Sequence, residues 1–234
     1  MGVPHLNIPI IKDRLLFSIL KSNPRNSSET FYFSIENTPE YQYRPFCQDF
    51  GPPSLLQLYK FTNYVESLLK DRKEKYVHFY STPNQEFKSN NVMYISFFRM
   101  IHFNLTAEEA YKPLSKLNGQ LIPFRDVANG PSTFDLHVID ILRGIYKAIE
   151  NGWFDFNHFN ADQCEFLEKL ENGNMNWIIP GKLLSLSSPY SFDSLPGNPD
   201  IKVANSKTVI PIFQRDDMKI NYIVRLNKHY YNSN

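Results

Sequence analysis

The chain has 234 residues, of which 42% are hydrophobic and 21% charged, and its formal net charge is +1. A chain of this length can bury a large core, and its composition excludes a disordered or low-complexity protein. Basic and acidic residues nearly cancel, so no overall field would attract a polyanion, and we expect no nucleic-acid partner. The sequence has no run of about 18 uncharged apolar residues, so we expect no membrane partner either.

The sequence encodes no recognisable metal or cofactor site. Its two cysteines, Cys47 and Cys164, lie far apart and form no CxxC or Cys/His cluster. The histidines lack paired-ligand spacing, and the 9 glycines form no nucleotide-binding loop. We therefore expect no metal and no cofactor, and this cysteine usage fits a reducing nuclear or cytoplasmic location.

The first half of the chain predicts a helix, a strand and a second helix. Residues 53–70 repeat apolar side chains at helical spacing. Residues 76–80 are rich in β-formers and predict a short buried strand. Residues 81–84 break this strand, and residues 91–103 then carry a new apolar stripe at helical spacing.

Three further helices are predicted by periodicity and by end signals. They span residues 106–118, 133–151 and 160–170, and the Asn-Gly pairs at residues 118–119, 151–152 and 172–173 mark their ends. The first opens with a Thr-x-x-Glu capping box, and Asn160 can cap the third. Residues 121–124 fit one more short strand.

The character of the sequence changes after Trp177. Residues 178–186 predict a strand, and residues 187–204 predict a loop rich in Pro, Ser, Gly and Asn. Residues 208–213 fit either a strand or a short helix, and residues 220–226 predict a strand whose neighbours are missing. A composition shift of this kind often marks a new unit.

Eight short segments, taken in order along the chain, resemble a known family. They are Asp13-Arg14-Leu15, Tyr32-Phe33-Ser34, Asp49-Phe50-Gly51-Pro52, Pro123-Phe124-Arg125-Asp126, Gly152-Trp153-Phe154-Asp155-Phe156, Glu171-Asn172-Gly173, Asn176-Trp177-Ile178-Ile179-Pro180-Gly181-Lys182 and Val224-Arg225-Leu226-Asn227. In this order they resemble the dual-specificity protein phosphatases of the mitotic-exit, cell-division-cycle-fourteen type.

The resemblance implies an α/β fold in two phosphatase-like domains, of which only the second is catalytic. On this basis residues 11–151 form a degenerate N-terminal domain, with a central sheet flanked by helices and without catalytic residues. Residues 152–175 form a helical interdomain linker, and residues 176–234 are the first strands of a truncated catalytic domain. The implied general acid and phosphate loop lie beyond residues 225–227.

The sequence contains no Cys-x5-Arg phosphate loop. This spacing lets backbone N–H groups and a guanidinium surround one phosphate while a thiolate attacks it. Six residues after Cys47 stands Pro53, and six residues after Cys164 stands Leu170. We therefore predict no catalytic residue and no enzymatic activity in this chain, and structural roles for both cysteines.

The strand at residues 76–78 resembles the one that ends in His-Cys in active members of the wider phosphatase superfamily. Phe79 stands where the Cys would be, and Gln85 stands where the Arg would be. One interpretation is a degenerate copy of the phosphate loop, and the other is an ordinary strand with a hydrogen-bonded His78. The residues alone favour neither interpretation, whereas the family resemblance favours the degenerate copy.

An acidic stripe is predicted on one helix face, formed by Asp162, Glu165, Glu168 and Glu171. The common explanation of such a stripe is a solvated surface. The family resemblance implies an acidic groove that receives a basic residue a few positions after a phosphosite, and Glu165 and Glu168 match two of its positions. Asn174 stands where the family has Asp, which implies a weaker or less basic-selective groove.

Two functions of different class follow from these observations. The first is the N-terminal portion of a cell-cycle phosphatase, which contributes scaffold and substrate-selecting surface but no catalysis. The alternative is a stand-alone pseudophosphatase that binds phosphoproteins. The expected partners are phosphoprotein substrates with a basic residue after the phosphosite, and the missing catalytic half or a homologous partner surface. No motif supports an unrelated enzyme that uses His78 or a carboxylate pair.

Overall fold

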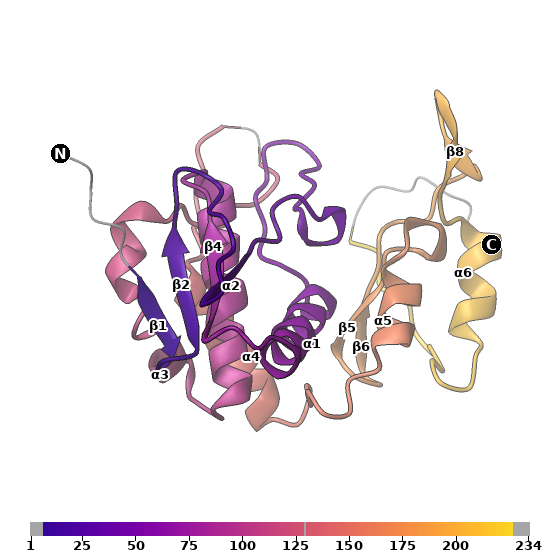
Figure 1. Cartoon of the computed structure of the whole chain (residues 1–234). Helices are drawn as coiled ribbons and strands as arrows, with labels where there is room; N and C mark the ends of the chain where they lie inside the picture. Colours follow the sequence, from indigo (N-terminus) through magenta and orange to yellow (C-terminus); the bar gives the residue numbers. More distant parts are fainter. Residues whose placement is uncertain (1–6, 129, 227–234) are drawn as a thin grey trace. The chain divides into compact units, whose positions relative to one another are not determined.

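The computed structural model describes residues 7–128 and 130–226. The chain divides into two compact units, Met1–Phe156 and Asn157–Asn234. In Figure 1 the first unit runs from indigo to pink and the second from orange to yellow. Each unit has strands and helices of its own, so the two are described separately.

A mixed four-stranded sheet forms the centre of the first unit. Its strands, in spatial order, are β1 (Ile8–Ile11), β2 (Leu15–Ile19), β4 (Tyr76–Ser81) and β3 (Thr30–Phe33). β1 runs antiparallel to β2, whereas β4 runs parallel to both β2 and β3. The strand predicted at residues 76–80 is confirmed and lies inside the sheet. β1 begins at Ile8, before the domain start expected at residue 11.

Helix α1 (Leu55–Asp71) confirms the helix predicted at residues 53–70. It begins at Leu55 because Ser54 caps it. The Ser54 Oγ accepts the Gln57 N–H, and the Gln57 side chain accepts the Ser54 N–H. The face turned to the core has helical spacing and consists of Leu56, Leu58, Phe61, Thr62, Val65 and Leu68.

Helix α2 (Gln85–His102) is longer than the helix predicted at residues 91–103. Asn84 caps it, and its Oδ1 accepts the Phe87 N–H at 3.0 Å. The apolar pattern does not reveal the first two turns because the side chains buried there are polar. These are Lys88, Ser89, Asn90 and Asn91.

The capping box predicted at residues 106–109 is present and opens helix α3 (Ala107–Tyr111). The prediction that this helix reaches residue 118 is wrong. Pro113 has no N–H to continue the helix, and the chain goes on as the 3-10 helix η2 (Ser115–Gln120). A further short 3-10 helix, η1 (Pro39–Tyr41), precedes α1.

Helix α4 (Val138–Glu150) begins later than the predicted start near residue 133. Its true start is a capping box in which the Asp140 carboxylate accepts the His137 N–H at 2.9 Å. Acidic side chains are favoured in the first turn of a helix, where the macrodipole is positive. The Asn-Gly pair at residues 151–152 ends the helix as predicted, with Gly152 at φ +67°.

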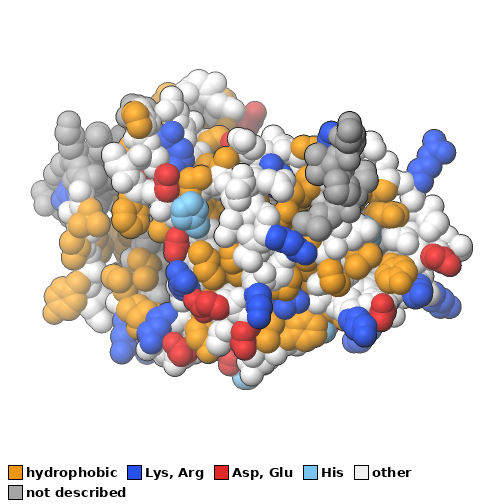
Figure 2. Space-filling view, turned by 90° about the vertical axis from the view of Figure 1, so that its left-hand side faces the viewer, with side chains coloured by type: hydrophobic (Ala, Val, Ile, Leu, Met, Phe, Trp, Pro, Cys, Tyr) orange, Lys and Arg blue, Asp and Glu red, His pale blue; other side chains and the backbone are white. Residues whose placement is uncertain are grey.

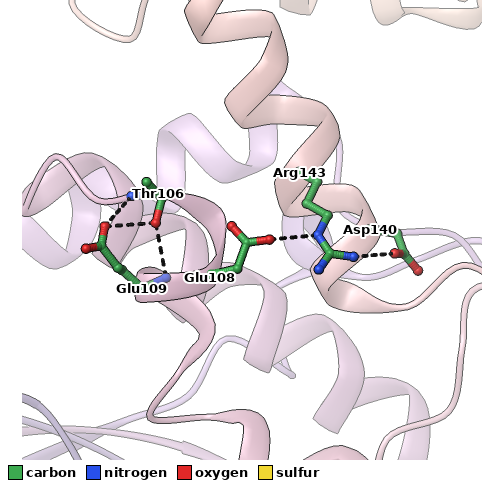
Figure 3. Close-up of polar contacts among 5 residues, drawn as sticks. All are labelled: Thr106, Glu108, Glu109, Asp140 and Arg143. Atoms are coloured by element: carbon green, nitrogen blue, oxygen red, sulfur yellow. Dashed lines mark hydrogen bonds and ion pairs between the residues drawn. The ribbon is translucent and has the colours of Figure 1, made fainter.

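α2 is the central helix of the first unit and packs against α1, α3, α4 and β4. Polar contacts also join α3 to α4 (Figure 3). Arg143 Nε donates to Glu108 Oε1 at 2.8 Å, and Arg143 Nη1 lies 3.5 Å from Asp140 Oδ1. Exposed ion pairs of this kind contribute at most about 1 kcal/mol each. Apolar packing therefore holds these helices together.

Aromatic rings fill the core between the sheet and the helices. The Phe79 ring of β4 lies 5.4 Å from Phe17, 5.0 Å from Phe33 and 5.1 Å from Phe61, measured between centroids. Tyr94 of α2 extends this cluster, at 4.9 Å from Phe61. All five rings lie within the distance range of favourable aromatic pairs. This packing uses part of the chain's high aromatic content of 15%.

The second unit consists of short helices and two hairpins. Its elements are α5 (Ala161–Glu168), η3 (Leu170–Asn172), β5 (Asn176–Ile179), β6 (Leu183–Ser185), β7 (Ser194–Leu195), β8 (Asn198–Lys202) and α6 (Ser206–Phe213). β5 pairs with β6 and β7 with β8, both antiparallel. The β7–β8 hairpin projects from this unit (Figure 1). The small core contains Leu167, Met175, Ala204, Val209, Ile212, Phe213 and Met218.

Three predictions for the second unit are corrected or decided by the structure. Residues 178–186 do not form one strand but are divided between β5 and β6, which pair as a hairpin. The chain reverses at Gly181, whose φ is +70°. Residues 187–204 contain the β7–β8 hairpin where a loop is predicted. Residues 208–213, which fit a strand or a helix, belong to α6.

Residues 220–226 form no strand, contrary to the prediction. Several of their apolar side chains are largely exposed, with Tyr222 at 91% and Leu226 at 94%. A strand needs a neighbour to take its N–H and C=O groups, and none of the strands in the described residues pairs with this segment. Asn227, the last residue of the Val-Arg-Leu-Asn segment, lies outside the described residues.

On the face shown in Figure 2, basic and acidic side chains are interspersed with apolar ones. This arrangement agrees with the near-zero net charge of the chain. Within the described residues, no helix is both long enough and apolar enough to cross a membrane.

Candidate functional site

The β4–α2 turn is the place where the sequence predicts a copy of a phosphate loop, and its strand–turn–helix order is observed. β4 ends at Ser81, and α2 begins at Gln85 after the capping residue Asn84. Phe79 lies within β4, before the strand ends, and is fully buried. Gln85 is the exposed first residue of α2.

The environment of Phe79 differs from that of a nucleophile in a phosphate loop. Its side chain points into the aromatic core between the sheet and α1, as the ring distances above show. A thiolate needs stabilising N–H donors or cations around it. Even a cysteine at this position would face Phe rings, so the geometry of this turn supports no nucleophile at residue 79.

His78 points away from Phe79, because neighbouring residues of a strand face opposite sides of the sheet. Its Nε2 lies 2.6 Å from Ser18 Oγ on β2, and its ring stacks on Tyr32 of β3 at 4.8 Å. Burial lowers the pKa of His78 to about 4. The hydrogen-bonded core histidine and the strand–turn–helix order are therefore both present, and the two interpretations of this segment are compatible.

Glu36, from the segment that follows β3, contacts this turn, and the sequence alone does not predict this contact. Its side chain is buried, with 6% exposed. One oxygen, Oε1, accepts the Ser81 hydroxyl at 2.9 Å, the Thr82 N–H at 2.7 Å and the Asn91 amide at 3.0 Å. No local pattern marks Glu36, since its partners lie 45 to 55 residues away along the chain.

A small pocket of about 30 Å³ lies beside Glu36. Within the part of the chain that the structure describes, the Oδ1 of Asn90 is buried without a hydrogen-bond partner. Burial and the nearby Glu40 carboxylate raise the pKa of Tyr41 to about 12, so this phenol stays protonated. The pocket has room for an ordered water molecule. It is lined by Ile35, Glu36, Tyr41, Tyr43, Glu86, Phe87, Asn90 and Asn91.

The acidic stripe is shorter in the structure than in the prediction. Asn160 caps α5 as predicted, but the helix ends at Glu168 and not at residue 170. Glu171 therefore lies on η3, outside the helix that carries Glu165 and Glu168. Glu165 is exposed, and Glu168 is half-buried with its Oε1 3.6 Å from Cys164 Sγ. Three of the four predicted carboxylates, Asp162, Glu165 and Glu168, thus lie on α5.

Asn174, where the family resemblance implies an acidic residue, has a backbone role. Its φ is +47°, a left-handed conformation that Asn tolerates better than most residues. Its side chain donates to Ser187 Oγ at 3.2 Å.

Neither cysteine lies in a disulfide, and Cys47 is exposed. The Cys47 N–H donates to Asp49 Oδ1 at 2.7 Å, and Tyr43 donates to the same carboxylate. These donors, the Tyr43 hydroxyl first, lower the pKa of Asp49 to about 2. Across residues 7–128 and 130–226, no three His, Cys, Asp or Glu side chains gather as a metal site would require.

Two of the segments that carry the family resemblance are joined through their backbones. Phe50 and Arg125, from two such segments, form a backbone bridge with hydrogen bonds of 3.2 and 2.8 Å. Residues 121–124 are predicted as a strand, but the structure has no strand there. Phe124 forms an isolated β-bridge with Leu136. A Cβ at Gly51 would lie 2.8 Å from the Tyr43 ring, so a larger residue there would have to displace this ring.

The mixed sheet and its buried central helix place the first unit in the α/β class, as predicted. Residues 9–148 match the family model described as dual specificity protein phosphatase, N-terminal half. The chain is 36% identical over 233 residues to the dual specificity protein phosphatase CDC14AB of Danio rerio. It is 36% identical over 231 residues to CDC14A of Homo sapiens, and 26% identical over 231 residues to the tyrosine-protein phosphatase CDC14 of Saccharomyces cerevisiae.

These alignments cover 95%, 94% and 96% of this chain, but 36%, 37% and 41% of the three relatives. The chain therefore spans less than half the length of these relatives. It belongs to the CDC14-type dual specificity protein phosphatases and corresponds to their N-terminal region. The resemblance drawn from the eight short segments is confirmed.

Proposed function

We propose that this chain is the N-terminal portion of a tyrosine/serine dual-specificity phosphatase that acts in cell-cycle control. In this proposal the chain supplies scaffold and a substrate-selecting surface, and a catalytic half outside these 234 residues dephosphorylates the phosphoprotein. We further propose a nuclear or cytoplasmic location, where both cysteines stay reduced.

The observation that carries the proposal is that, in a chain of this family, the β4–α2 segment has Phe79 and Gln85 in place of a cysteine and an arginine. Phe79, which the family resemblance aligns with the catalytic cysteine, is buried in the aromatic core, and Gln85, which it aligns with the phosphate-binding arginine, is the exposed first residue of α2. A neutral amide cannot supply the positive charge of an arginine fork. The first unit therefore suits a structural role beside a separate catalytic centre.

Glu165 and Glu168 are the residues that we propose for substrate selection. They lie three residues apart on α5, so their carboxylates share one side of the helix. A Lys or Arg that follows the phosphosite of a substrate would contact these carboxylates. Such contacts between partly exposed charges are modest in free energy and weaken as salt is added.

The proposal is tested with two phosphoserine peptides that differ in one residue, a Lys or a Gln three positions after the phosphoserine. The wild-type chain should bind the Lys peptide about 3- to 10-fold more tightly at low salt, and the difference should shrink at higher salt. The double variant E165K/E168K should lose this preference. The control D200K, which makes half of this charge change on the exposed strand β8, should keep it. Equal affinity of the wild type for both peptides would contradict the proposed role of Glu165 and Glu168 in substrate selection.

The alternative function is a stand-alone pseudophosphatase that recognises phosphoprotein partners. It is favoured by the first unit having a sheet and an aromatic core of its own. The sequence of the transcript downstream of Asn234 separates the two functions. An open frame with His-Cys-x5-Arg supports the phosphatase, and a stop codon supports the binding protein.

A missing catalytic half, or a homologous surface of another protein, is the partner that we propose for residues 222–226. Their apolar side chains are exposed, with Ile223 at 62% and Val224 at 80%. Exposed apolar segments without a paired strand commonly mark a contact surface.

A further inference from the structure

Three hydrogen-bond donors of the β4–α2 turn converge on one carboxylate oxygen, Glu36 Oε1. Ser81 is the last residue of β4, Thr82 is the first residue of the turn, and Asn91 lies in α2. Ser81 and Asn91 are 0% and 2% exposed, so these donors are shielded from bulk solvent. The backbone of Glu36 is also held, since the Gln42 side-chain amide donates to its carbonyl at 2.8 Å.

The donors around Glu36 are neutral. Among the described residues, no Lys or Arg forms an ion pair with this carboxylate, which is held by a backbone N–H, an amide and a hydroxyl. The Ser81 hydroxyl has a second acceptor, Thr82 O at 3.0 Å, so Thr82 and Asn91 are the dedicated donors. Proteins hold oxyanions with donor sets of this composition, and an ion shielded from bulk solvent needs such bonds.

A second internal acceptor satisfies the start of α2. Asn84 Oδ1 accepts the Phe87 N–H at 3.0 Å, which is one of the N–H groups that a helix leaves available at its N-terminus. A phosphate loop presents such donors to its ligand. In this chain the Thr82 N–H of the turn donates to Glu36 instead, and the Phe87 N–H of the helix start donates to Asn84.

We propose that the β4–α2 turn is an anion-binding site whose resident ligand is the chain's own Glu36 carboxylate. Glu36 excludes phosphate from the wild-type turn. Removal of this carboxylate opens the donor set of Ser81, Thr82 and Asn91 to a small free oxyanion of the carboxylate or phosphate class. This inference holds whether or not the chain is part of a phosphatase.

The test is chemical rescue of the variant E36A of the full chain. Its unfolding midpoint is measured as inorganic phosphate or acetate is added, against sodium chloride of equal ionic strength. E36A should unfold at a lower temperature than the wild type. Saturating phosphate or acetate should then raise its midpoint by about 3 °C, because a ligand that binds only the folded state stabilises it. The wild type should not respond beyond the chloride control.

Three variants make the test specific. E36Q keeps a carbonyl oxygen in place of Oε1 and should respond to neither anion. E86A makes the same charge change in the first turn of α2, where the side chain is exposed, and should show only a non-specific salt effect. The double variant E36A/N91A should respond more weakly than E36A because a dedicated donor is lost.

A response of E36A no larger than that of E86A, or a saturable response of the wild type, would overturn the proposal. If E36A is unfolded without anion, the readout is recovery of its near-ultraviolet circular dichroism and of cooperative unfolding. Recovery with phosphate or acetate but not chloride supports the proposal. Failure of both anions to restore the fold refutes it.

Discussion

His78 and Ser18 are joined by a buried hydrogen bond between two parallel strands, with 2.6 Å separating His78 Nε2 from Ser18 Oγ. The imidazole is 4% exposed and carries the Tyr32 ring on its face. Burial lowers the pKa of His78 to about 4, from 6.5. The folded first unit therefore contains a neutral imidazole near neutral pH.

We expect the stability of the chain to fall as the pH drops from 6.5 towards 4. In this interval the unfolded chain binds a proton at His78 that the folded chain does not bind, so protonation favours unfolding. The loss should reach about 3 kcal/mol near the lower limit and then level off. Urea unfolding at a series of pH values measures it.

The variant H78Q should lose this part of the pH dependence, because glutamine does not titrate. If H78Q and the wild type lose stability in parallel between these pH values, His78 is not the buried base that the structure indicates.

Arg14 holds the end of α1 against the sheet, and its replacement should destabilise the chain. Its guanidinium donates to the carbonyls of Leu69 at 2.7 Å and Arg72 at 2.8 Å, and also to the carbonyl of Glu74. A cation is favoured at the C-terminal end of a helix. R14A should cost about 2 kcal/mol, and R14K about 1 kcal/mol, because an ammonium cannot form the same fork.

The matched control for Arg14 is R25A, which removes an exposed arginine from a loop. It should change the free energy of unfolding by less than about 0.5 kcal/mol. Urea unfolding of the three variants provides the comparison. If R14A and R25A lower the free energy of unfolding equally, water hydrogen-bonds to these carbonyls as well as Arg14 does.

The parts of the fold that sequence reasoning predicts correctly have local signals. α1 and its start follow from apolar spacing and a capping residue, and β4 follows from a run of β-formers. The first turns of α2 escape the apolar pattern because Ser89 and Asn90 are polar yet buried. The β5–β6 hairpin is missed because one backbone reversal, at Gly181, divides an apolar run.

In the candidate site, too, only the features with a local sequence signal are predicted correctly. The strand–turn–helix order around Phe79 and Gln85 is readable because its residues are neighbours in sequence. The buried position of Glu36 cannot be predicted from the sequence, because its hydrogen-bond donors are brought to it only by the fold. The length of the acidic stripe is misjudged because the chain leaves α5 after Glu168 in an extended conformation.

Among the residues that the structure describes, 221–226 should show the lowest protection from hydrogen exchange. These residues pair with none of the strands that the structure describes, and their side chains are largely exposed. The β5–β6 and β7–β8 hairpins should be less protected than α2, because isolated two-stranded sheets are marginally stable. Protection of the second unit equal to that of α2 in the monomer would contradict this order.

The last prediction concerns catalysis by the chain alone. We expect no hydrolysis of aryl or peptide phosphates above background between about pH 5 and pH 8. Phosphate-monoester hydrolysis is among the slowest uncatalysed reactions, so a measurable rate requires a nucleophile, phosphate-binding donors and a leaving-group acid together. Neither cysteine is followed by the arginine of a Cys-x5-Arg loop, and Glu36 takes the donors of the β4–α2 turn.

The decisive measurement is turnover of a chromogenic aryl phosphate, with vanadate as inhibitor, in the wild type and in C47S, C164S and the double variant. Losses in such sites are far from additive, so an isolated thiol is not expected to retain a proportionate share of activity. Vanadate-sensitive turnover that survives the double substitution would reveal a site outside both cysteines. Turnover that disappears with C47S alone would assign the nucleophile to Cys47, which is the exposed thiol of the two.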